Sequence, residues 1–307
     1  MYTNQQRIIT FDLMKGVCII LVILAHLVFT QGLPKQIIHS FHMPLFLIIA
    51  GVFARNWTDI SSFRQYTIKN AKRLLLPYVV TMLMLCVWGG IQAYAKHDIS
   101  FFLRQLFSML AASADGWHTQ WGLIYAGPMW FLIALFWVRE IFVGIQYACR
   151  RMCGKYKDMF ILVISLLLSI ISVIVYPYLP SLPFCISQSF TALGFYGLGW
   201  YIHRHPMPWW VYGLSIPVWP FAIMLGCINI ESCTMQYYPL SFIGACGGTY
   251  VVYLLCKGIA KLREFANSIN FTRTTFNIPS PLTWCGLYSL PILCMHEFEM
   301  YSDMYNM

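Results

Sequence analysis

Long apolar runs alternate with short polar segments along most of the chain. Nine of these runs have roughly the 20 residues that an α-helix needs to cross the hydrocarbon core of a bilayer. They cover residues 14–31, 37–54, 74–95, 128–148, 159–176, 185–203, 208–228, 238–259 and 283–300. The pattern predicts an all-α integral membrane protein, a polytopic bundle of about nine to ten transmembrane helices.

The stretches between these runs are mostly too short to fold by themselves. Residues 101–112, FFLRQLFSMLAA, are apolar on one side and too short to cross a bilayer, so we expect an interfacial or re-entrant helix there. The spacing predicts a single membrane-embedded domain over residues 1–307. Apolar residues make up 59% of the chain and charged residues 10%, whereas soluble domains are about 45–50% apolar.

Lys and Arg are distributed unevenly between the predicted loops. With the N-terminus in the cytoplasm, sixteen of the 20 basic residues fall in cytoplasmic segments and three in outer loops, as expected for a membrane protein. We therefore expect residues 55–73, 149–158 and 260–282 inside and residues 113–125 outside. The formal charge of +9 then reflects topology, and no nucleic-acid partner is predicted.

The 11 cysteines lie mostly inside apolar runs, where they are typical of small buried hydrophobic residues. Cys149 and Cys153 share a loop, but no His and Cys set with the spacing of a zinc site accompanies them. We expect no metal ion.

The first apolar run contains three ionisable residues. In DLMKGVCIILVILAH, Lys15 and His26 lie about 20° apart around a helix and Asp12 lies about 40° from His26, so all three share one face. The rise from Lys15 to His26 is roughly 16 Å. Ionisable residues at membrane depth should face protein or water and mark functional sites. A structural role remains open, with Asp12 capping the helix, Lys15 reaching the interface and His26 bonding a neighbouring helix.

Further candidates lie in later segments. His42, in FHMPLF, starts the second run, from where it is expected to approach His26 and assist acid–base chemistry. Arg139 and Glu140 lie near the middle of the 128–148 run; neighbours in sequence do not face each other on a helix, so each needs another partner. The aromatic loop 115–125 suits a sugar ring or a membrane interface; its candidates are Trp117, His118 and Trp121.

Several motifs follow one another along the chain in the order that is typical of one protein family. They are DLMKG followed ten residues after Lys15 by His26, FHMPLF with Gly51, KRLLLPY at 72–78, PMWFL at 128–132, Gly194–Tyr201, and SLPI at 289–292 with His296. This series resembles the acyltransferase 3 family, and especially its fucose 4-O-acetylase-like membrane acetyltransferases.

The resemblance implies an acyltransferase that moves an acetyl group from cytoplasmic acetyl-CoA to a hydroxyl of a surface glycan or lipid-linked sugar. It implies the inner (plasma) membrane of a bacterium, with the bilayer and a sugar as partners. His26 would deprotonate the hydroxyl or carry the acyl group, with His42, Asp12 and Glu140 assisting. Lys15 stands where many relatives have Arg. The implied CoA-binding set is Lys15, Lys72 and Arg73, the last two in a basic loop before Pro77, and the implied substrate-binding set adds Trp130 and Arg139.

Two alternative functions remain open. Relatives usually continue beyond the segment that matches Ser289–His296 into another helix, so an inactive truncated homologue is one alternative. A transporter or flippase of a glycan precursor is the other. That class is expected to show inverted repeats and broken helix pairs, and no such symmetry is visible in the sequence.

Overall fold

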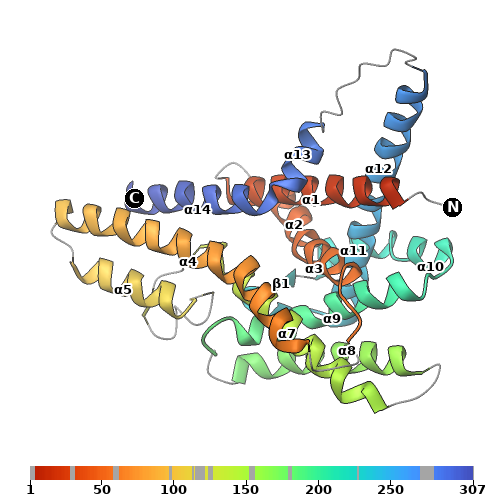
Figure 1. Cartoon of the computed structure of the whole chain (residues 1–307), viewed down its shortest axis with the longest axis horizontal. Helices are drawn as coiled ribbons and strands as arrows, with labels where there is room; N and C mark the ends of the chain where they lie inside the picture. Colours follow the sequence, from red (N-terminus) through yellow and green to blue (C-terminus); the bar gives the residue numbers. More distant parts are fainter. Residues whose placement is uncertain are drawn as a thin grey trace. The chain divides into compact units, whose positions relative to one another are not determined.

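The structure is a computed structural model, and almost every element in it is a helix (Figure 1). It describes residues 4–27, 32–57, 62–96, 99–112, 114, 122–123, 127–151, 156–178, 182–226, 228–269 and 280–306. The first half contains α1 (Asn4–His26), α2 (Leu33–His39), α3 (His42–Val52), α4 (Phe63–Lys96), α5 (Ile99–Leu110) and α7 (Trp130–Ala148). The second half contains α8 (Lys157–Val175), α9 (Ile186–Arg204), α10 (Trp209–Gly213), α11 (Val218–Leu225), α12 (Tyr238–Ile269), α13 (Pro281–Leu287) and α14 (Ser289–Asn306).

Short elements join some of these helices. Two 3-10 helices, Cys149–Arg151 and Tyr176–Tyr178, extend α7 and α8. A two-stranded sheet of β1 (Ile228–Asn229) and β2 (Thr234–Met235) precedes α12.

Six helical segments of the described residues are long and apolar enough to cross a membrane. They are Ile9–His26, Leu33–Val52, Phe63–Gln92, Trp130–Arg151, Lys157–Tyr178 and Tyr238–Phe265. The prediction of an α-helical membrane protein is confirmed, whereas the count of nine to ten spans is not. Helix α9 matches the predicted run 185–203 but is not apolar enough to be among the six.

Two predicted spans are broken into shorter helices. The run 208–228 forms α10 and α11, and the turn between them ends at Pro217, which directly precedes α11. Consecutive apolar residues do not reveal such a break. The run 283–300 forms α13 and α14, which meet at Tyr288. The short helix expected at 101–112 is present as α5.

The basic segment 63–73 is helical, and its prediction as a loop was wrong. Helix α4 runs through it without a break, so Lys72 and Arg73 lie on α4. Pro77 lies inside the helix, where it leaves the Arg73 carbonyl without an i+4 N–H partner. Neighbouring groups in membrane proteins can satisfy such a carbonyl, which explains why the proline did not mark a helix start.

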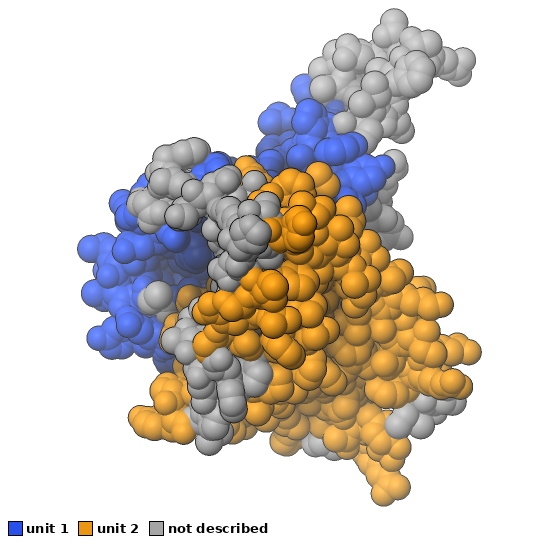
Figure 2. All heavy atoms as spheres, turned by 90° about the vertical axis from the view of Figure 1, so that its left-hand side faces the viewer, with its two compact units in different colours: residues 1–49, 207–228, 235–292 blue, residues 50–206, 229–234, 293–307 orange. Residues whose placement is uncertain are grey.

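The chain divides into two compact units, coloured separately in Figure 2. Unit 1 comprises residues 1–49, 207–228 and 235–292, and unit 2 comprises residues 50–206, 229–234 and 293–307. In unit 1, α1 packs against α12 and α13, and α11 packs against α12. Leu13, Cys18, Leu45 and Cys256 belong to its buried apolar core.

In unit 2, α8 and α9 lie side by side (Figure 1), and α7 packs against both α4 and α9. Small hydroxyl residues connect α8 to α9: Ser169 donates to the Thr191 carbonyl at 2.6 Å and Ser172 to the Ser187 carbonyl at 3.0 Å. Such residues allow close helix approach and add hydrogen bonds between membrane helices.

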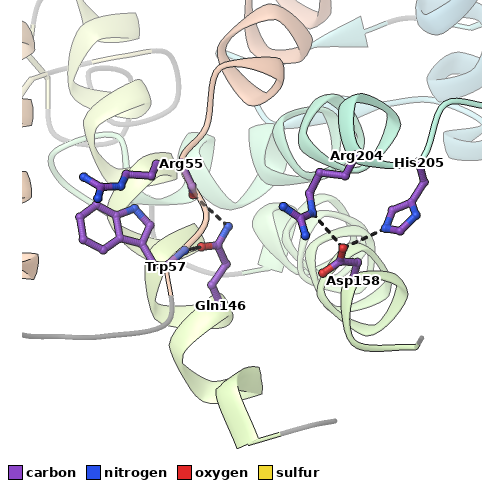
Figure 3. Close-up of polar contacts among 6 residues, drawn as sticks. All are labelled: Arg55, Trp57, Gln146, Asp158, Arg204 and His205. Carbon is purple, nitrogen blue, oxygen red and sulfur yellow. Dashed lines mark hydrogen bonds and ion pairs between the residues drawn. The ribbon is translucent and has the colours of Figure 1, made fainter. Parts of the chain in front are cut away.

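Polar contacts at one end of unit 2 join two further pairs of segments (Figure 3). The Gln146 amide accepts a hydrogen bond from the Trp57 backbone N–H at 2.7 Å and donates to the Arg55 carbonyl at 3.3 Å. Asp158, in the first turn of α8, accepts hydrogen bonds from Arg204 Nε at 2.9 Å and His205 Nε2 at 2.8 Å. These contacts hold the segment after α3 against α7, and the start of α8 against the end of α9.

Candidate functional site

Asp12 and Lys15 form an ion pair on α1. Lys15 Nζ lies 3.1 Å from Asp12 Oδ1, with Asp12 buried and Lys15 half-buried. Helix α1 begins at Asn4, so Asp12 lies two turns inside it and the alternative that it caps the helix was wrong. The spacing of three residues puts both side chains on one face, where each neutralises the other.

Gly16, directly after Lys15, lets α13 approach α1 closely. A Cβ atom on Gly16 would overlap the Leu282 carbonyl, and one on Gly286 would overlap the Asp12 carbonyl. Two backbones can come this near only where both helices carry glycine at the crossing, as membrane helices often do. The Asp12–Lys15 pair is therefore held on a helix whose position is fixed by backbone contact.

His26 is the last residue of α1 and is exposed on unit 1. Its Nδ1 lies 2.8 Å from the carbonyl oxygen of Val22. A carbonyl oxygen only accepts, so Nδ1 carries the hydrogen and the lone pair of the neutral ring is on Nε2. An imidazole in this form presents Nε2 as a base.

His42 opens α3 and is buried. Its Nδ1 lies 2.8 Å from the Ile38 carbonyl, so it has the same tautomer as His26. The Cys18 thiol on α1 donates to the His42 carbonyl at 3.0 Å, which connects the start of α3 to α1. His26 acts electrostatically on His42, and the two histidines that the sequence singled out belong to the same unit.

A third imidazole accompanies them. His39, at the end of α2, packs against His42 edge to face, with ring centroids 5.0 Å apart. The sequence analysis missed His39, although the spacing of three residues in HSFH was visible.

Arg139 and Glu140 belong to a hydrogen-bonded network between α7 and α4 in unit 2. Glu140 accepts from the Thr67 hydroxyl at 2.7 Å and from Asn70 Nδ2 at 2.8 Å. Arg139 Nη1 donates to Asn70 Oδ1 at 2.9 Å. Each therefore has a partner other than its neighbour in sequence, as expected, and the two residues share Asn70 of α4. Thr67 and Asn70 were missed, because uncharged polar residues in a basic segment gave no signal.

The two basic residues of KRLLLPY, Lys72 and Arg73, are exposed on α4. Arg73 interacts electrostatically with Arg139. Lys15 belongs to unit 1, whereas Lys72 and Arg73 belong to unit 2.

Trp130 is the first residue of α7 and is buried, with 4% of its surface exposed. Next to it, the Met129 N–H donates to the Glu297 carboxylate at 3.3 Å. Glu297 is buried on α14 and also lies against Gly127. Glu297 was missed because the sequence reading stopped at its neighbour His296.

The remaining predicted residues lie outside the described part of the chain. They are Trp117, His118 and Trp121. Among the residues that the structure describes, no group of three His, Cys, Asp or Glu side chains is arranged to hold a metal ion.

Comparisons with known proteins agree with the motif series. A family model described as "Acyltransferase domain" matches residues 8–302. Nodulation protein NolL of Sinorhizobium fredii (strain NBRC 101917 / NGR234) is 28% identical over 186 residues, which is 57% of this chain and 47% of that protein. Nodulation protein NolL of Mesorhizobium japonicum (strain LMG 29417 / CECT 9101 / MAFF 303099) is 26% identical over 245 residues, 73% of this chain and 57% of that protein.

The chain thus spans about half the length of these two curated relatives. No solved structure matches it.

Proposed function

The chain belongs to the acyltransferase 3 family, and from this premise we propose that it is a membrane O-acetyltransferase. It transfers an acetyl group from cytoplasmic acetyl-CoA to a hydroxyl of a surface glycan or lipid-linked sugar. It resides in the inner (plasma) membrane of a bacterium with its N-terminus in the cytoplasm. The uneven distribution of Lys and Arg supports this orientation.

The observation that carries the proposal is the form of the two histidines. His26 and His42 each have Nδ1 committed to a backbone carbonyl one turn earlier, which leaves Nε2 as the basic nitrogen. A hydroxyl attacks a thioester only slowly unless a base removes its proton as the new bond forms. His26 acts as this base: its Nε2 takes the proton while the oxygen bonds to the acetyl carbon and the C–S bond to CoA breaks. His42 supports His26 or the developing oxyanion.

In this proposal, positively charged side chains bind the acetyl donor, acetyl-CoA. Lys15, Lys72 and Arg73 bind the phosphates of CoA as positive charges, although Lys lacks the planar fork by which Arg binds phosphate with two hydrogen bonds. The ion pair with Asp12 keeps Lys15 on the face that it shares with His26. Lys15 then lies near the middle of α1, on the cytoplasmic side of His26, and His26 at the outer end, so one helix face leads from the donor side to the acceptor side.

The acceptor side is assigned to aromatic and polar residues. Flat rings suit the faces of a sugar, and the proposed residues are Trp117, His118, Trp121 and Trp130. Arg139 and Glu140 contribute a fixed pair of opposite charges, which Asn70 orients from α4.

The experiment is mass spectrometry of surface glycans from cells with and without the protein. We expect one acetyl mass, on a sugar hydroxyl, to depend on the protein. A strain that expresses His26→Ala at the same level in the membrane is the matched control and should lack that mass. Identical glycan spectra in cells with and without the protein would contradict the proposal, and a different added mass would correct the acyl group.

A further inference from the structure

The three histidines of unit 1 differ in their hydrogen bonding. The Nδ1 atoms of His26 and His42 bond to carbonyls of their own chain segments. His39 Nε2, in contrast, is buried and has no hydrogen-bond partner among the residues that the structure describes. Buried polar atoms in native proteins are almost always bonded, so an exception calls for an explanation such as a role in proton transfer.

The distance between the His39 and His42 rings suits a hydrogen bond between them. Two imidazoles joined by an N–H···N bond of about 2.9 Å have centroids roughly 5 Å apart. The observed separation is 5.0 Å, with the ring planes 73° apart. The angle about the Cβ–Cγ bond of histidine is broadly variable. Rotation of one ring therefore converts the edge-to-face contact into a nitrogen–nitrogen contact without moving the backbone.

The charged groups around His39 and His42 disfavour the binding of more than one proton by the three imidazoles. A proton that one ring receives is therefore passed on. The groups that act electrostatically on His39 are Lys35 on its own helix and His26 on α1, and those that act on His42 are His39 and His26. All of these groups are cations or become cations on protonation. Because like charges at short range repel, a proton received by one of the three rings discourages a second.

We propose that His39 is a proton-transfer residue that acts through His42, which makes the three imidazoles a short relay. The inference rests on the proposed function. His26 takes the proton from the acceptor hydroxyl, and CoA leaves as the thiolate. The proton passes from His26 to His42 and then to the buried Nε2 of His39; because the His39 side chain is only half-buried, its other ring nitrogen, Nδ1, releases a proton to water. The thiolate takes up one proton from the aqueous phase, so the relay returns to its neutral state after each turnover.

Two substitutions of His39 separate proton transfer from packing. His39→Phe keeps a ring against His42 but removes both nitrogens, and His39→Ala leaves a space that imidazole can enter. The assay is CoA release from acetyl-CoA in proteoliposomes with methyl fucoside as the acceptor. For His39→Phe we expect kcat to fall about tenfold with an unchanged KM for acetyl-CoA and an altered pH–rate profile. For His39→Ala we expect added imidazole to restore turnover, whereas pyrrole, which has the same shape but no basic nitrogen, does not.

Contrary results would overturn the relay. A wild-type pH–rate profile in His39→Phe, or equal recovery of His39→Ala with pyrrole and imidazole, would make His39 a packing residue. If His26→Ala is inactive while both His39 variants are normal, the relay fails and the proposed function stands. If wild-type protein transfers no acetyl group to any cellular glycan, the proposed function fails as well.

A second measurement does not depend on turnover. In protein with ¹⁵N-labelled histidine, we expect His39→Phe to shift the ¹⁵N resonance of His42 Nε2, because that atom loses its exchange partner. His205→Phe, which removes the imidazole of unit 2 that is bound to Asp158, is the matched control and should leave that resonance in place. An unchanged His42 resonance in His39→Phe would contradict the relay.

Discussion

Two polar centres, one in each unit, use ionisable residues in opposite ways. In unit 1, each of His26 and His42 commits one ring nitrogen to a carbonyl and keeps the other as a base. In unit 2, both oxygens of Glu140 already accept hydrogen bonds, from Thr67 and Asn70. In the first centre a backbone carbonyl fixes which ring nitrogen carries the hydrogen, whereas the second centre holds its charges in place.

The difference concerns what an ionisable residue in a membrane helix indicates. Such residues are candidates for function by default, but the hydrogen bonds around them decide which function. A base needs an open lone pair. A carboxylate whose two oxygens each accept a hydrogen bond is held in one orientation and contributes a negative charge at a fixed place.

The largest effect is expected at the base. His26→Ala should lower acetyl transfer by about 10²–10⁴-fold, the usual contribution of a general base. Because His26 is exposed and packs little, the amount of protein in the membrane should not change. Glycan mass spectrometry at matched expression measures both. Transfer near the wild-type level would remove His26 from the chemistry and leave the two centres indistinguishable.

A smaller effect is expected at Lys15. Lys15→Met removes the cation that we propose binds CoA and takes from Asp12 its ion-pair partner, so KM for acetyl-CoA should rise by about 10- to 100-fold, the range of one charge-assisted hydrogen bond. A phosphate is held equally in the ground and transition states, so kcat should change less. Lys15→Arg is the control and should be mild. A decrease in kcat with an unchanged KM would move Lys15 from donor binding to the chemistry.

The second centre can be examined by exchanging the carboxylate of Glu140 and the amide of Asn70. Asn70→Asp places two carboxylates together and should destabilise the protein by about 1–3 kcal/mol. Adding Glu140→Gln restores one amide and one carboxylate in reversed positions, so thermal unfolding should return close to that of the wild type. Acetyl transfer should stay about tenfold low, because the negative charge has moved from α7 to α4. Full recovery of activity in the double variant would show that Glu140 only holds the helices together.

The smallest effect is expected at Asp158. Its partners Arg204 and His205 have 36% and 45% of their side-chain surface exposed, and exposed ion pairs contribute about 0–1 kcal/mol. Asp158→Asn should change acetyl transfer less than twofold and thermal unfolding only slightly. A loss of transfer comparable with that of the Asn70 variant would mean that this end of unit 2 (Figure 3) belongs to the site.

The sequence predicted the membrane-helical class because apolar length is a local property of the chain. Helix boundaries depend on more than local hydropathy. The apolar content of residues 208–228 does not reveal the turn before Pro217, and the charges of residues 63–73 do not reveal that α4 continues through Pro77. In both places the backbone hydrogen bonds of the folded protein decide where a helix begins or continues. Pro217 directly precedes a helix, whereas Pro77 lies inside one.

For the site, helical periodicity was sufficient where both residues lie on one helix, as for Asp12 and Lys15. The need of Arg139 and Glu140 for partners was also predictable, but the identity of the partners was not. Asn70 and Thr67 are about 70 residues away in sequence and come into contact through the packing of α4 on α7. His39 was overlooked because its spacing of three residues from His42 does not by itself reveal that the two rings pack together.

The contact between Gly16 and Gly286 has a consequence for the order of synthesis. Helix α1 leaves the ribosome early, but the backbone against which it packs follows roughly 270 residues later. At about 5–20 residues per second, this interval lasts on the order of 15–50 s. During that time the Asp12–Lys15 face has no α13 beside it. The helix that carries the proposed base therefore waits for its contact with α13 during most of translation.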